Sequence, residues 1–408
     1  MEESILARKP VLNSIQKVIA YEIIFKNSYD NKINAENIGV TAEAINNDVE
    51  FIEQTNLSHG KKIFMNFNRA LLKDEIVKFL AKDNLGIEIS EGIEYDANLI
   101  KNIVKLKNEG ALIILNDFNP YKPNTTLIKY ADIIKLDFNK FKEEHSLIIN
   151  RLKNKYNKSL KFLAENINEH AQFDKAKECD YDYFQGIFFT KPEVMANRDI
   201  PGYKLNYLNF LKELNKEEID FDRLESIIKN DMSMTVSLLS TINSAYYGYN
   251  VSSIKHASTL LGINGLKKWS LIYLAEGLRN DKPDILFVNT LTRAKFAEAA
   301  AEDFGVKEKS DELFTVGMLS MMDAFLNRSL ENIIDEISLK GDIKDALLKG
   351  EGIFGEILRL AIAFERVKWE EISLIEKQYG LNPKKLYNKY LEAVDFSYET
   401  MNMLIEQS

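Results

Sequence analysis

The sequence is short of cysteine and histidine. Its 408 residues include one cysteine, Cys179, so no internal disulfide bond can form. That usage suits a reducing compartment, and we expect a cytoplasmic protein. The four histidines limit any metal site that is built on imidazole ligands.

Long apolar runs and an excess of basic charge are absent too. No stretch approaches the ~20 apolar residues of a membrane-spanning helix, and Met1–Pro10 is too charged for a secretory signal. The net charge is −9 and the isoelectric point is near 5.3. We therefore expect no membrane and no nucleic acid among the partners, because a general grip on either needs positive charge.

Two halves with different patterns make up the chain, whose length suits two domains. The first half alternates short apolar runs with amphipathic stretches, which predicts a sheet of parallel strands closed into an α/β barrel. The predicted strands are Val18–Phe25, Ile63–Phe67, Leu85–Ile89, Leu112–Leu115, Ile133–Leu136, Leu160–Leu163 and Tyr183–Phe189. From about Tyr203 onward the apolar spacing is helical, which predicts an all-α half.

Most of these apolar runs carry or end in a polar residue. In a parallel barrel the ends of the strands face one mouth, which is where such folds build their sites. Carboxylate and amide oxygens that converge there suit a hard cation such as Mg²⁺. The polar residues, in chain order, are Glu22, Asn66, Glu88, Asn116, Asp117, Lys135, Glu165 and Gln185. Any one of them alone would be read as a solvated strand end.

The first half resembles an EAL domain, the barrel that hydrolyses cyclic di-GMP in bacterial signalling. The resemblance rests on an ordered set of segments across residues 1–197. They are Ala7-Arg8-Lys9-Pro10-Val11, where the family usually has Gln-Pro-Ile, Glu22-Ile23-Ile24 with Lys26, Asn66, Glu88-Ile89-Ser90-Glu91, Asn116-Asp117-Phe118, Lys135-Leu136-Asp137, Ala164-Glu165 and Gln185-Gly186.

The resemblance implies a role for each residue of this set. Mg²⁺ or Mn²⁺ would activate a water that attacks a phosphodiester. The metal ligands would be Glu22, Asn66, Glu88 and Asn116. Asp117, Lys135 and Glu165 would be catalytic, and Lys26 and Gln185 would bind the substrate.

Departures from the family pattern favour a weak or absent phosphodiesterase. Asn116 stands where the pattern D-D-F-G-T-G has its first aspartate, so one negative charge is lost. Both glycines of the following loop are missing, and Pro120 stiffens it. In the family this loop couples the metal site to dimerisation. Asn168 stands where A-E-G-V-E has its second acid.

The second half resembles an HDOD domain, a relative of the HD phosphohydrolases. Asp231-Met232-Ser233, Ile242-Asn243-Ser244-Ala245 and Ile254–Gly262 match its segments. Where HD hydrolases have an adjacent His-Asp pair, this chain has Ser320-Met321, so we expect no metal site. His256 is expected on a helix surface. The tyrosines of Tyr246-Tyr247-Gly248-Tyr249 are either a partner platform or a packed loop.

We therefore predict an EAL-like α/β barrel, similar to a TIM barrel, at residues 1–197, a short linker at 198–204 and an HDOD-like all-α domain at 205–408. The expected function is bacterial signal transduction. The barrel would sense or scaffold, binding cyclic di-GMP without hydrolysis, and the HDOD domain would bind a protein partner. The alternative is an active metal-dependent phosphodiesterase that gives linear pGpG. A third reading is an interaction module without nucleotide affinity, and a homodimer is left open.

Overall fold

The computed structural model describes residues 5–25, 57–73, 84–121, 126–141, 144–193, 202–216, 218–242, 254–279, 282–337, 339 and 341–407. The chain divides into two compact units, which are described separately. Unit 1 comprises Met1–Phe189 with Glu365–Val367, and unit 2 comprises Thr190–Phe364 with Lys368–Ser408.

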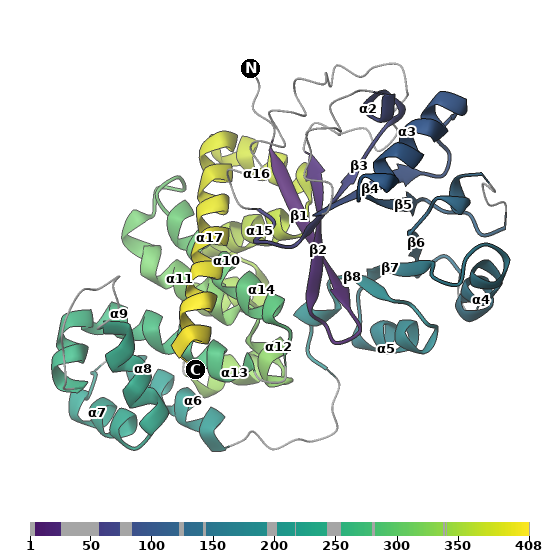
Figure 1. Ribbon diagram of the computed structural model, residues 1–408. Helices are drawn as coiled ribbons and strands as arrows, with labels where there is room; N and C mark the ends of the chain where they lie inside the picture. Colours follow the sequence, from purple (N-terminus) through teal and green to yellow (C-terminus); the bar gives the residue numbers. More distant parts are fainter. Residues whose placement is uncertain are drawn as a thin grey trace. The chain divides into compact units, whose positions relative to one another are not determined.

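Unit 1 is a closed barrel of eight strands, paired in the order of the chain (Figure 1). Its helices α3, α4 and α5 lie outside the ring of strands. The strands are β1 (Leu6–Asn13), β2 (Val18–Phe25), β3 (Lys62–Asn66), β4 (Leu85–Ser90), β5 (Leu112–Asn116), β6 (Ile133–Asp137), β7 (Lys161–Ile167) and β8 (Tyr183–Gly186). The helices and 3₁₀ turns are α2 (Arg69–Lys73), α3 (Ala97–Asn108), η3 (Leu127–Lys129), α4 (His145–Lys155), α5 (His170–Glu178) and η4 (Phe188–Thr190). The predicted barrel is confirmed.

The expectation of a wholly parallel sheet is wrong at β1. This strand pairs antiparallel with both of its neighbours, β2 and β8. The reason is the short connection Ser14–Lys17, which leaves room only for a hairpin. Asn13 closes the turn, because its side-chain oxygen accepts from the backbone amides of Ile15 and Lys17 at 3.1 and 2.9 Å. A second correction concerns Tyr183–Phe189, where the strand ends at Gly186.

A layer of apolar side chains fills the inside of the barrel. Its members come from six strands, so they can meet only in the interior. They are Val11, Ala20, Phe64, Ile114, Ile133 and Leu163, with Tyr183 of β8 packed against them. On β4 the layer has Gly86 instead, because a Cβ there would lie 2.4 Å from the Phe64 ring. The barrel therefore has a solid core below its mouth.

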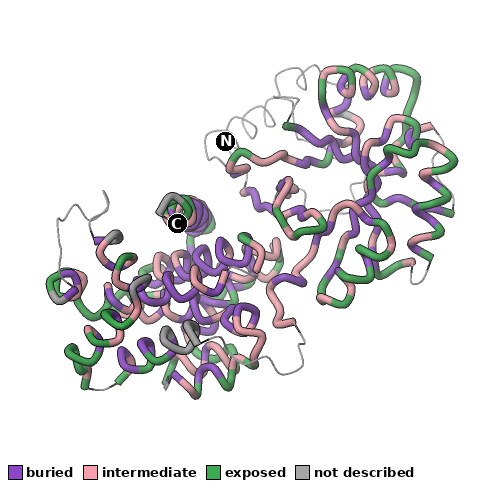
Figure 2. Tube along the Cα trace, turned by 60° about the horizontal axis from the view of Figure 1, so that its bottom comes forward, coloured by how far each residue is buried: buried purple, intermediate pink, exposed green. Residues whose placement is uncertain are grey.

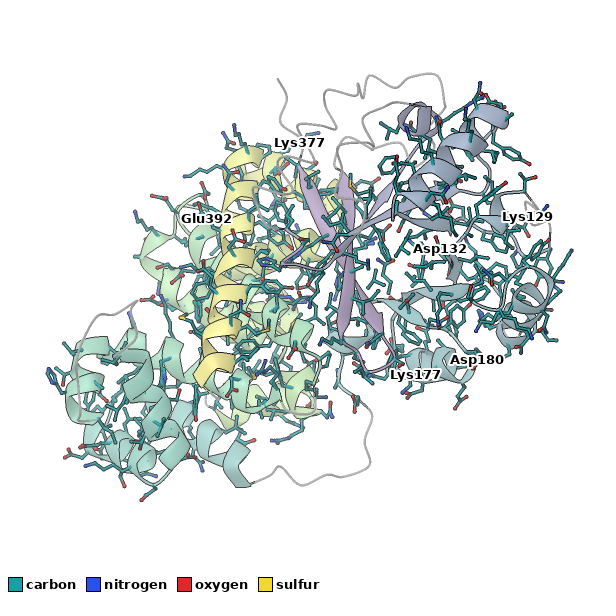
Figure 3. The ribbon with its side chains drawn as sticks, viewed as in Figure 1. Lys129, Asp132, Lys177, Asp180, Lys377 and Glu392 are labelled. Carbon is teal, nitrogen blue, oxygen red and sulfur yellow. The ribbon has the colours of Figure 1, made fainter. Side chains whose placement is uncertain are left out.

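Asp132 fastens the opposite end of the barrel, just before β6. Asp132 is labelled in Figure 3. It accepts from the backbone amide of Ile113 at 2.9 Å and pairs with Lys107 of α3 at 2.6 Å. Asp182 repeats this arrangement before β8, since it accepts from the amide of Phe162 at 3.0 Å. These carboxylates satisfy strand amides at a sheet end, so this end of the barrel is a structural element.

Unit 2 is helical in every described element, as the sequence predicts. Its helices are α6 (Gly202–Leu214), α7 (Phe221–Lys229), α8 (Met232–Ile242), α9 (Ile254–Gly277), α10 (Asp284–Ala300), α11 (Ser310–Leu319), α12 (Met322–Leu326), α13 (Leu330–Glu336), α14 (Asp342–Lys349), α15 (Gly352–Glu365), α16 (Trp369–Tyr379) and α17 (Pro383–Gln407), with the 3₁₀ turn η6 (Lys307–Lys309). None of the described helices is long and apolar enough to cross a membrane.

One helical stretch of the sequence is divided in the structure. The apolar spacing of Leu313–Asn327 indicates a single helix, but the structure has two, α11 and α12. The break falls at Ser320, whose hydroxyl donates to the carbonyl of Gly317 at 2.7 Å and competes with helical hydrogen bonding. The helical spacing also stops at Gly262, between the stretches Ile254–Leu261 and Leu266–Leu278. The structure agrees, because α9 joins two helices across a kink at Gly262, where φ is 64°.

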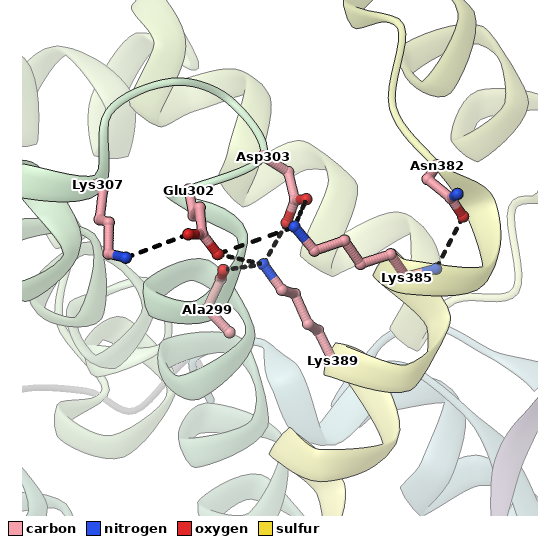
Figure 4. Close-up of polar contacts among 7 residues, drawn as sticks. All are labelled: Ala299, Glu302, Asp303, Lys307, Asn382, Lys385 and Lys389. Atoms are coloured by element: carbon pink, nitrogen blue, oxygen red, sulfur yellow. Dashed lines mark hydrogen bonds and ion pairs between the residues drawn. The ribbon is translucent and has the colours of Figure 1, made fainter.

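Helix α10 is the centre of unit 2. Most of its residues are buried. Figure 2 shows buried stretches along the helices of unit 2. Helices α11 and α17 pack against it. A charged cluster at its C-terminal end holds α17, as Figure 4 shows. Lys385 pairs with Asp303 at 2.8 Å, and Lys389 pairs with Asp303 and donates to the carbonyl of Ala299 at 2.7 Å.

Candidate functional site

The inward-facing polar residues of the barrel follow from the two-residue period of a strand. Side chains two positions apart point to the same face. Moving two residues from each member of the apolar layer, towards the C-terminal ends of the parallel strands, gives a polar set. We call this end the barrel mouth. The set is Lys9, Glu22, Asn66, Glu88, Asn116, Lys135, Glu165 and Gln185, one residue from each strand.

Lys135 lies at the centre of this set. Its Nζ is 3.1 Å from Oε1 of Glu22, 3.0 Å from Oε1 of Glu88 and 3.1 Å from Oε1 of Glu165. Lys135 and Glu88 are fully buried. Gln185 extends the network, because its Nε2 donates to Oε2 of Glu22 at 2.7 Å. Three carboxylates thus converge on one point, and a cation fills that point.

The pKa values of Glu22 and Glu88 shift in opposite directions. Burial raises the pKa of Glu22, but the charges of Lys135 and Lys9 and the hydrogen bond from Gln185 outweigh it, so the net shift is downward. Burial and the negative charge of Glu22 raise the pKa of Glu88 to about 8, although Lys135 opposes this. For Lys135, burial lowers the pKa, but the glutamates outweigh it and hold the pKa well above its usual value.

The raised pKa of Glu88 predicts that metal binding at the mouth depends on pH. A carboxyl group must lose its proton to bind a divalent ion, so Mn²⁺ affinity should rise from pH 6 towards pH 8.5, by up to about tenfold per pH unit below the pKa. The same raised pKa makes the unfolded chain lose this proton before the folded one. The contribution of Glu88 to the free energy of unfolding is therefore fully present below pH 4.5, the ordinary pKa of a glutamate. It is lost as the pH rises through about 8, the pKa in the folded protein.

Calorimetric titration with Mn²⁺ at several pH values measures this effect. Glu88→Gln is the control, because it removes the proton in question and should flatten the profile in this range. A wild-type affinity that does not change between pH 6 and pH 8.5 would contradict the assignment.

Asn116 and Asp117 lie at the end of β5, where the chain leaves the core. The amide oxygen of Asn116 accepts from the backbone N–H of Asp117 at 2.9 Å. Asp117 is exposed and has a left-handed backbone with φ of 54°. Its carboxylate accepts from the Ser90 hydroxyl at 3.4 Å. Asp117 thus stands at the rim of the mouth rather than inside the set around Lys135.

The loop after Asp117 is fastened to its surroundings. The backbone amide of Asn119 donates to Glu91 at 2.5 Å, and Arg151 of α4 donates to the carbonyl of Pro120 at 2.5 Å. The hydroxyl of Tyr121 donates to Glu144 at 2.6 Å. These contacts tie the rim of the mouth to β4 and α4, so the stiffness that Pro120 predicts is reinforced by three hydrogen bonds.

The nine site residues predicted from the sequence fall into four groups. Glu22, Glu88, Lys135, Glu165 and Gln185 form the contacting cluster. Asn66 and Asn116 lie on the inward-facing register of β3 and β5, Asn66 beside Glu88 but exposed, and Asn116 beside Ser90 and partly buried. Asp117 lies at the rim. Lys26 lies outside the described residues. The chemical roles of all nine remain predictions.

Lys9 is an inward-facing residue that the list of predicted site residues does not include. It lies directly opposite Glu22 in the antiparallel pair of β1 and β2. The signal in the sequence was its place before Pro10 and Val11, in a segment that resembles the opening strand of the EAL pattern. A charged residue at such a position is a candidate site residue once the strand is known to line the barrel.

The oxygen ligands at the mouth suit a divalent ion, but the ammonium of Lys135 competes with the ion for the same carboxylates. The oxygens of Glu22, Asn66, Glu88 and Asn116 are the hard ligands that Mg²⁺ and Mn²⁺ take. Within the described part of the chain, however, no three His, Cys, Asp or Glu side chains are arranged to hold a metal ion. At the mouth the reason is visible, since the carboxylates are gathered around the ammonium of Lys135.

In unit 2 a buried arginine lies beside the position of the missing His-Asp pair. Nη1 of Arg293 donates to the Ser320 hydroxyl at 3.2 Å. Burial raises the pKa of the nearby Asp323, although Arg293 opposes this. His256 is exposed on α9, and Lys268 is engaged with Glu298 and with Asp311, the latter at 2.6 Å. Tyr246-Tyr247-Gly248-Tyr249 lies outside the described residues.

Two curated proteins are similar to this chain over nearly its whole length. The uncharacterized protein YuxH of Bacillus subtilis is 29% identical over 97% of this chain and 98% of its own. The protein CdgJ of Vibrio cholerae, named as a cyclic di-GMP phosphodiesterase, is 26% identical over 99% of this chain and 94% of its own.

Solved structures with EAL domains are also similar to this chain. One is the Bacillus subtilis YkuI protein, described with an EAL domain in complex with cyclic di-GMP and calcium. It is 18% identical, with a TM-score of 0.36 over 64% of this chain and 72% of its own.

The helical half matches a family model. The model of the HDOD domain aligns with residues 200–341, which run from the end of the junction through α13. Residues 200–341 therefore match the HDOD domain and follow an eight-stranded barrel in the chain, and the chain is similar along its length to a Vibrio cholerae protein named as a cyclic di-GMP phosphodiesterase.

Proposed function

We propose that the barrel mouth binds cyclic di-GMP with little or no hydrolysis, and that the HDOD domain passes the bound state to a protein partner. One observation carries the proposal. Glu22, Glu88 and Glu165 are held around the ammonium of Lys135, whereas the neutral Asn116 stands where the EAL pattern has an aspartate. The binding cluster is thus retained, and the charge that a metal needs is reduced.

Each residue has a part in binding that its position supports. Lys135 and Gln185 carry N–H donors on the inner face of the mouth, and such donors suit the oxygens of a phosphodiester. Lys26, which lies outside the described residues, would add a further donor by its resemblance to the EAL pattern alone. Glu22, Asn66, Glu88 and Asn116 would hold Mg²⁺ or Mn²⁺, which would polarise the phosphate and activate a water. Glu165 and Asp117 would accept protons or orient the water.

Charge explains why hydrolysis is expected to be slow. The inward-facing set has three acids against two lysines, so its formal charge is −1 when all three acids have lost their protons. Metal affinity depends on how many ligands carry charge. Loss of one anion at Asn116 and one at Asn168, relative to the EAL pattern, weakens the hold on a divalent ion. A mouth that keeps its lysine centre can still attract an anionic nucleotide.

An active phosphodiesterase is the second candidate. It is favoured by the retained Glu22, Glu88, Lys135 and Glu165 and by the name of the Vibrio cholerae relative. In that case Asn116 would serve as a neutral oxygen ligand. A third candidate, a scaffold without nucleotide affinity, keeps only the partner role of the HDOD domain. Homodimerisation through the barrel would be compatible with all three.

Calorimetric titration of cyclic di-GMP into the whole protein tests the binding proposal. We expect saturable binding with a stoichiometry of one ligand per barrel, in Mg²⁺ and also in EDTA. Gln185→Ala should weaken binding, because it removes a donor from the inner face. If no heat of binding is measured in either buffer, the proposal is overturned, and the scaffold without nucleotide affinity becomes the favoured function.

Asn116→Asp is predicted to strengthen metal binding at the mouth. A carboxylate in place of the amide adds an anionic oxygen ligand, so Mn²⁺ affinity should rise about tenfold and linear product should become detectable. Asn108→Asp is the matched control, because it adds the same charge on an exposed position at the end of α3. Equal Mn²⁺ affinities for Asn116→Asp and the wild type would contradict the charge argument.

A further inference from the structure

Lys9 faces the interior of the barrel beside Glu22. In the β1–β2 register Lys9 is directly opposite Glu22, and Val11, two residues further on, belongs to the interior apolar layer. Opposite residues of an antiparallel pair project from the same face with Cβ atoms about 4.5–5.5 Å apart. The long lysine side chain therefore starts within reach of the carboxylate that lies opposite it.

The surroundings of Lys9 differ from those of Lys135. Lys135 is fully buried and paired with three glutamates, so its charge is balanced where it stands. Lys9 is only half-buried, and with the other described residues it forms no ion pair within 4 Å. Its charge is nevertheless felt by Glu22. The mouth thus contains a second cation, and no carboxylate of the described residues forms an ion pair with it.

Positive charge at this position has two consequences. A cation beside Glu22 repels a divalent ion that approaches the same carboxylate, so metal affinity falls. The same cation attracts an anion that enters the mouth, so a phosphate group can be held without metal. Asn116 acts in the same direction, because it removes an anion that would favour the metal.

We propose that Lys9 takes the place of a divalent ion beside Glu22, weakening metal binding and giving the mouth an affinity for phosphodiesters that does not require metal. The proposal rests on the proposed function, because the phosphodiester is the ligand assigned there. It deepens that function by naming the residue that makes binding metal-independent. The metal part can be tested alone.

Lys9→Gln removes the charge and keeps a polar side chain of similar length. Lys17→Gln is the matched control, since Lys17 is exposed in the turn that joins the same two strands. Each variant of the full chain is titrated with Mn²⁺ alone, and separately with cyclic di-GMP in EDTA at low and high salt. Near- and far-ultraviolet circular dichroism checks that both variants are folded.

We expect Lys9→Gln to bind Mn²⁺ about tenfold more tightly than the wild type, from the loss of one repelling charge. In EDTA it should bind cyclic di-GMP about tenfold more weakly and with a smaller salt dependence. Lys17→Gln should match the wild type in both titrations. Mn²⁺ affinity of Lys9→Gln within twofold of the wild type would overturn the proposal.

The two failures are distinguishable. A wild-type protein that does not bind cyclic di-GMP in either buffer contradicts the proposed function, and the Mn²⁺ titration still decides whether Lys9 repels the metal. A wild-type protein that binds cyclic di-GMP while Lys9→Gln binds it equally well in EDTA contradicts the role of Lys9 and leaves the proposed function intact.

Discussion

Lys135→Met should destabilise the barrel by about 3–5 kcal/mol, the range for removing one partner of a buried ion pair. The substitution keeps most of the apolar stem and removes the ammonium that sits within about 3 Å of the three glutamates. Glu22 and Glu88 would then face each other inside the barrel without a counter-charge. Their repulsion and lost hydrogen bonds are the cost. The unfolding transition that reports on unit 1 should move to lower denaturant concentration.

Lys161→Met is the matched control for this prediction. Lys161 lies on β7, next to β6, and pairs with Asp182 at 2.6 Å, but it is half exposed. Surface ion pairs contribute about 0–1 kcal/mol, so this variant should lose little stability. Urea unfolding followed by circular dichroism measures both variants. A loss in Lys135→Met no larger than that in Lys161→Met would contradict the buried-cluster account.

Gly317→Ala should destabilise unit 2 by about 3 kcal/mol or more, because overpacking forces backbones apart. Helices α10 and α11 cross closely at this residue. A Cβ on Gly317 would lie 2.3 Å from the Cα and 2.5 Å from the backbone nitrogen of Ala294. The neighbour is backbone, which cannot rotate away as a side chain can. The helix pair must therefore separate, and with it the packing around α10.

Ala297→Gly on α10 is the control, because it measures how much stability is lost when a buried residue of this helix is changed without adding a clash with α11. This residue is fully buried, and a glycine in a helix interior costs about 1 kcal/mol. The double variant Gly317→Ala with Ala294→Gly should not recover stability, because the clash is with main-chain atoms that glycine retains. Thermal unfolding measures all three variants. Full recovery in the double variant would show that the crossing is not set by backbone contact.

The polar residues of the barrel could be picked out from the sequence because each interrupts or ends an apolar run. Glu22, Glu88 and Lys135 lie on such runs, and in a barrel the strand ends face one mouth, so a shared location could be expected from the predicted fold. The direction of β1 did not follow in the same way. The direction of β1 depends on the tight turn between Asn13 and Lys17. The alternation of strands and helices in the rest of the half predicts parallel strands, so it gave no sign of this hairpin.

The central place of Lys135 depends on contacts between residues that are far apart in the sequence. Its partner Glu22 is 113 positions away, and the distance between them is set by how the barrel closes. Lys9 was missed for a similar reason. It lies opposite Glu22 because β1 and β2 form an antiparallel pair, and that pairing was not predicted. At the α11–α12 break, helical spacing continued through Ser320, while the hydrogen bond to Gly317 that ends the helix is a feature of the folded chain.

The most direct test of the central claim is product formation by the wild-type protein. Purified full-length chain is incubated with cyclic di-GMP and saturating Mn²⁺, and linear product is separated by chromatography, with Glu22→Ala as the blank. The account predicts bound nucleotide that is recovered intact, with product at the level of the blank. Multiple turnovers that disappear in Glu22→Ala would contradict it and establish the barrel as a phosphodiesterase.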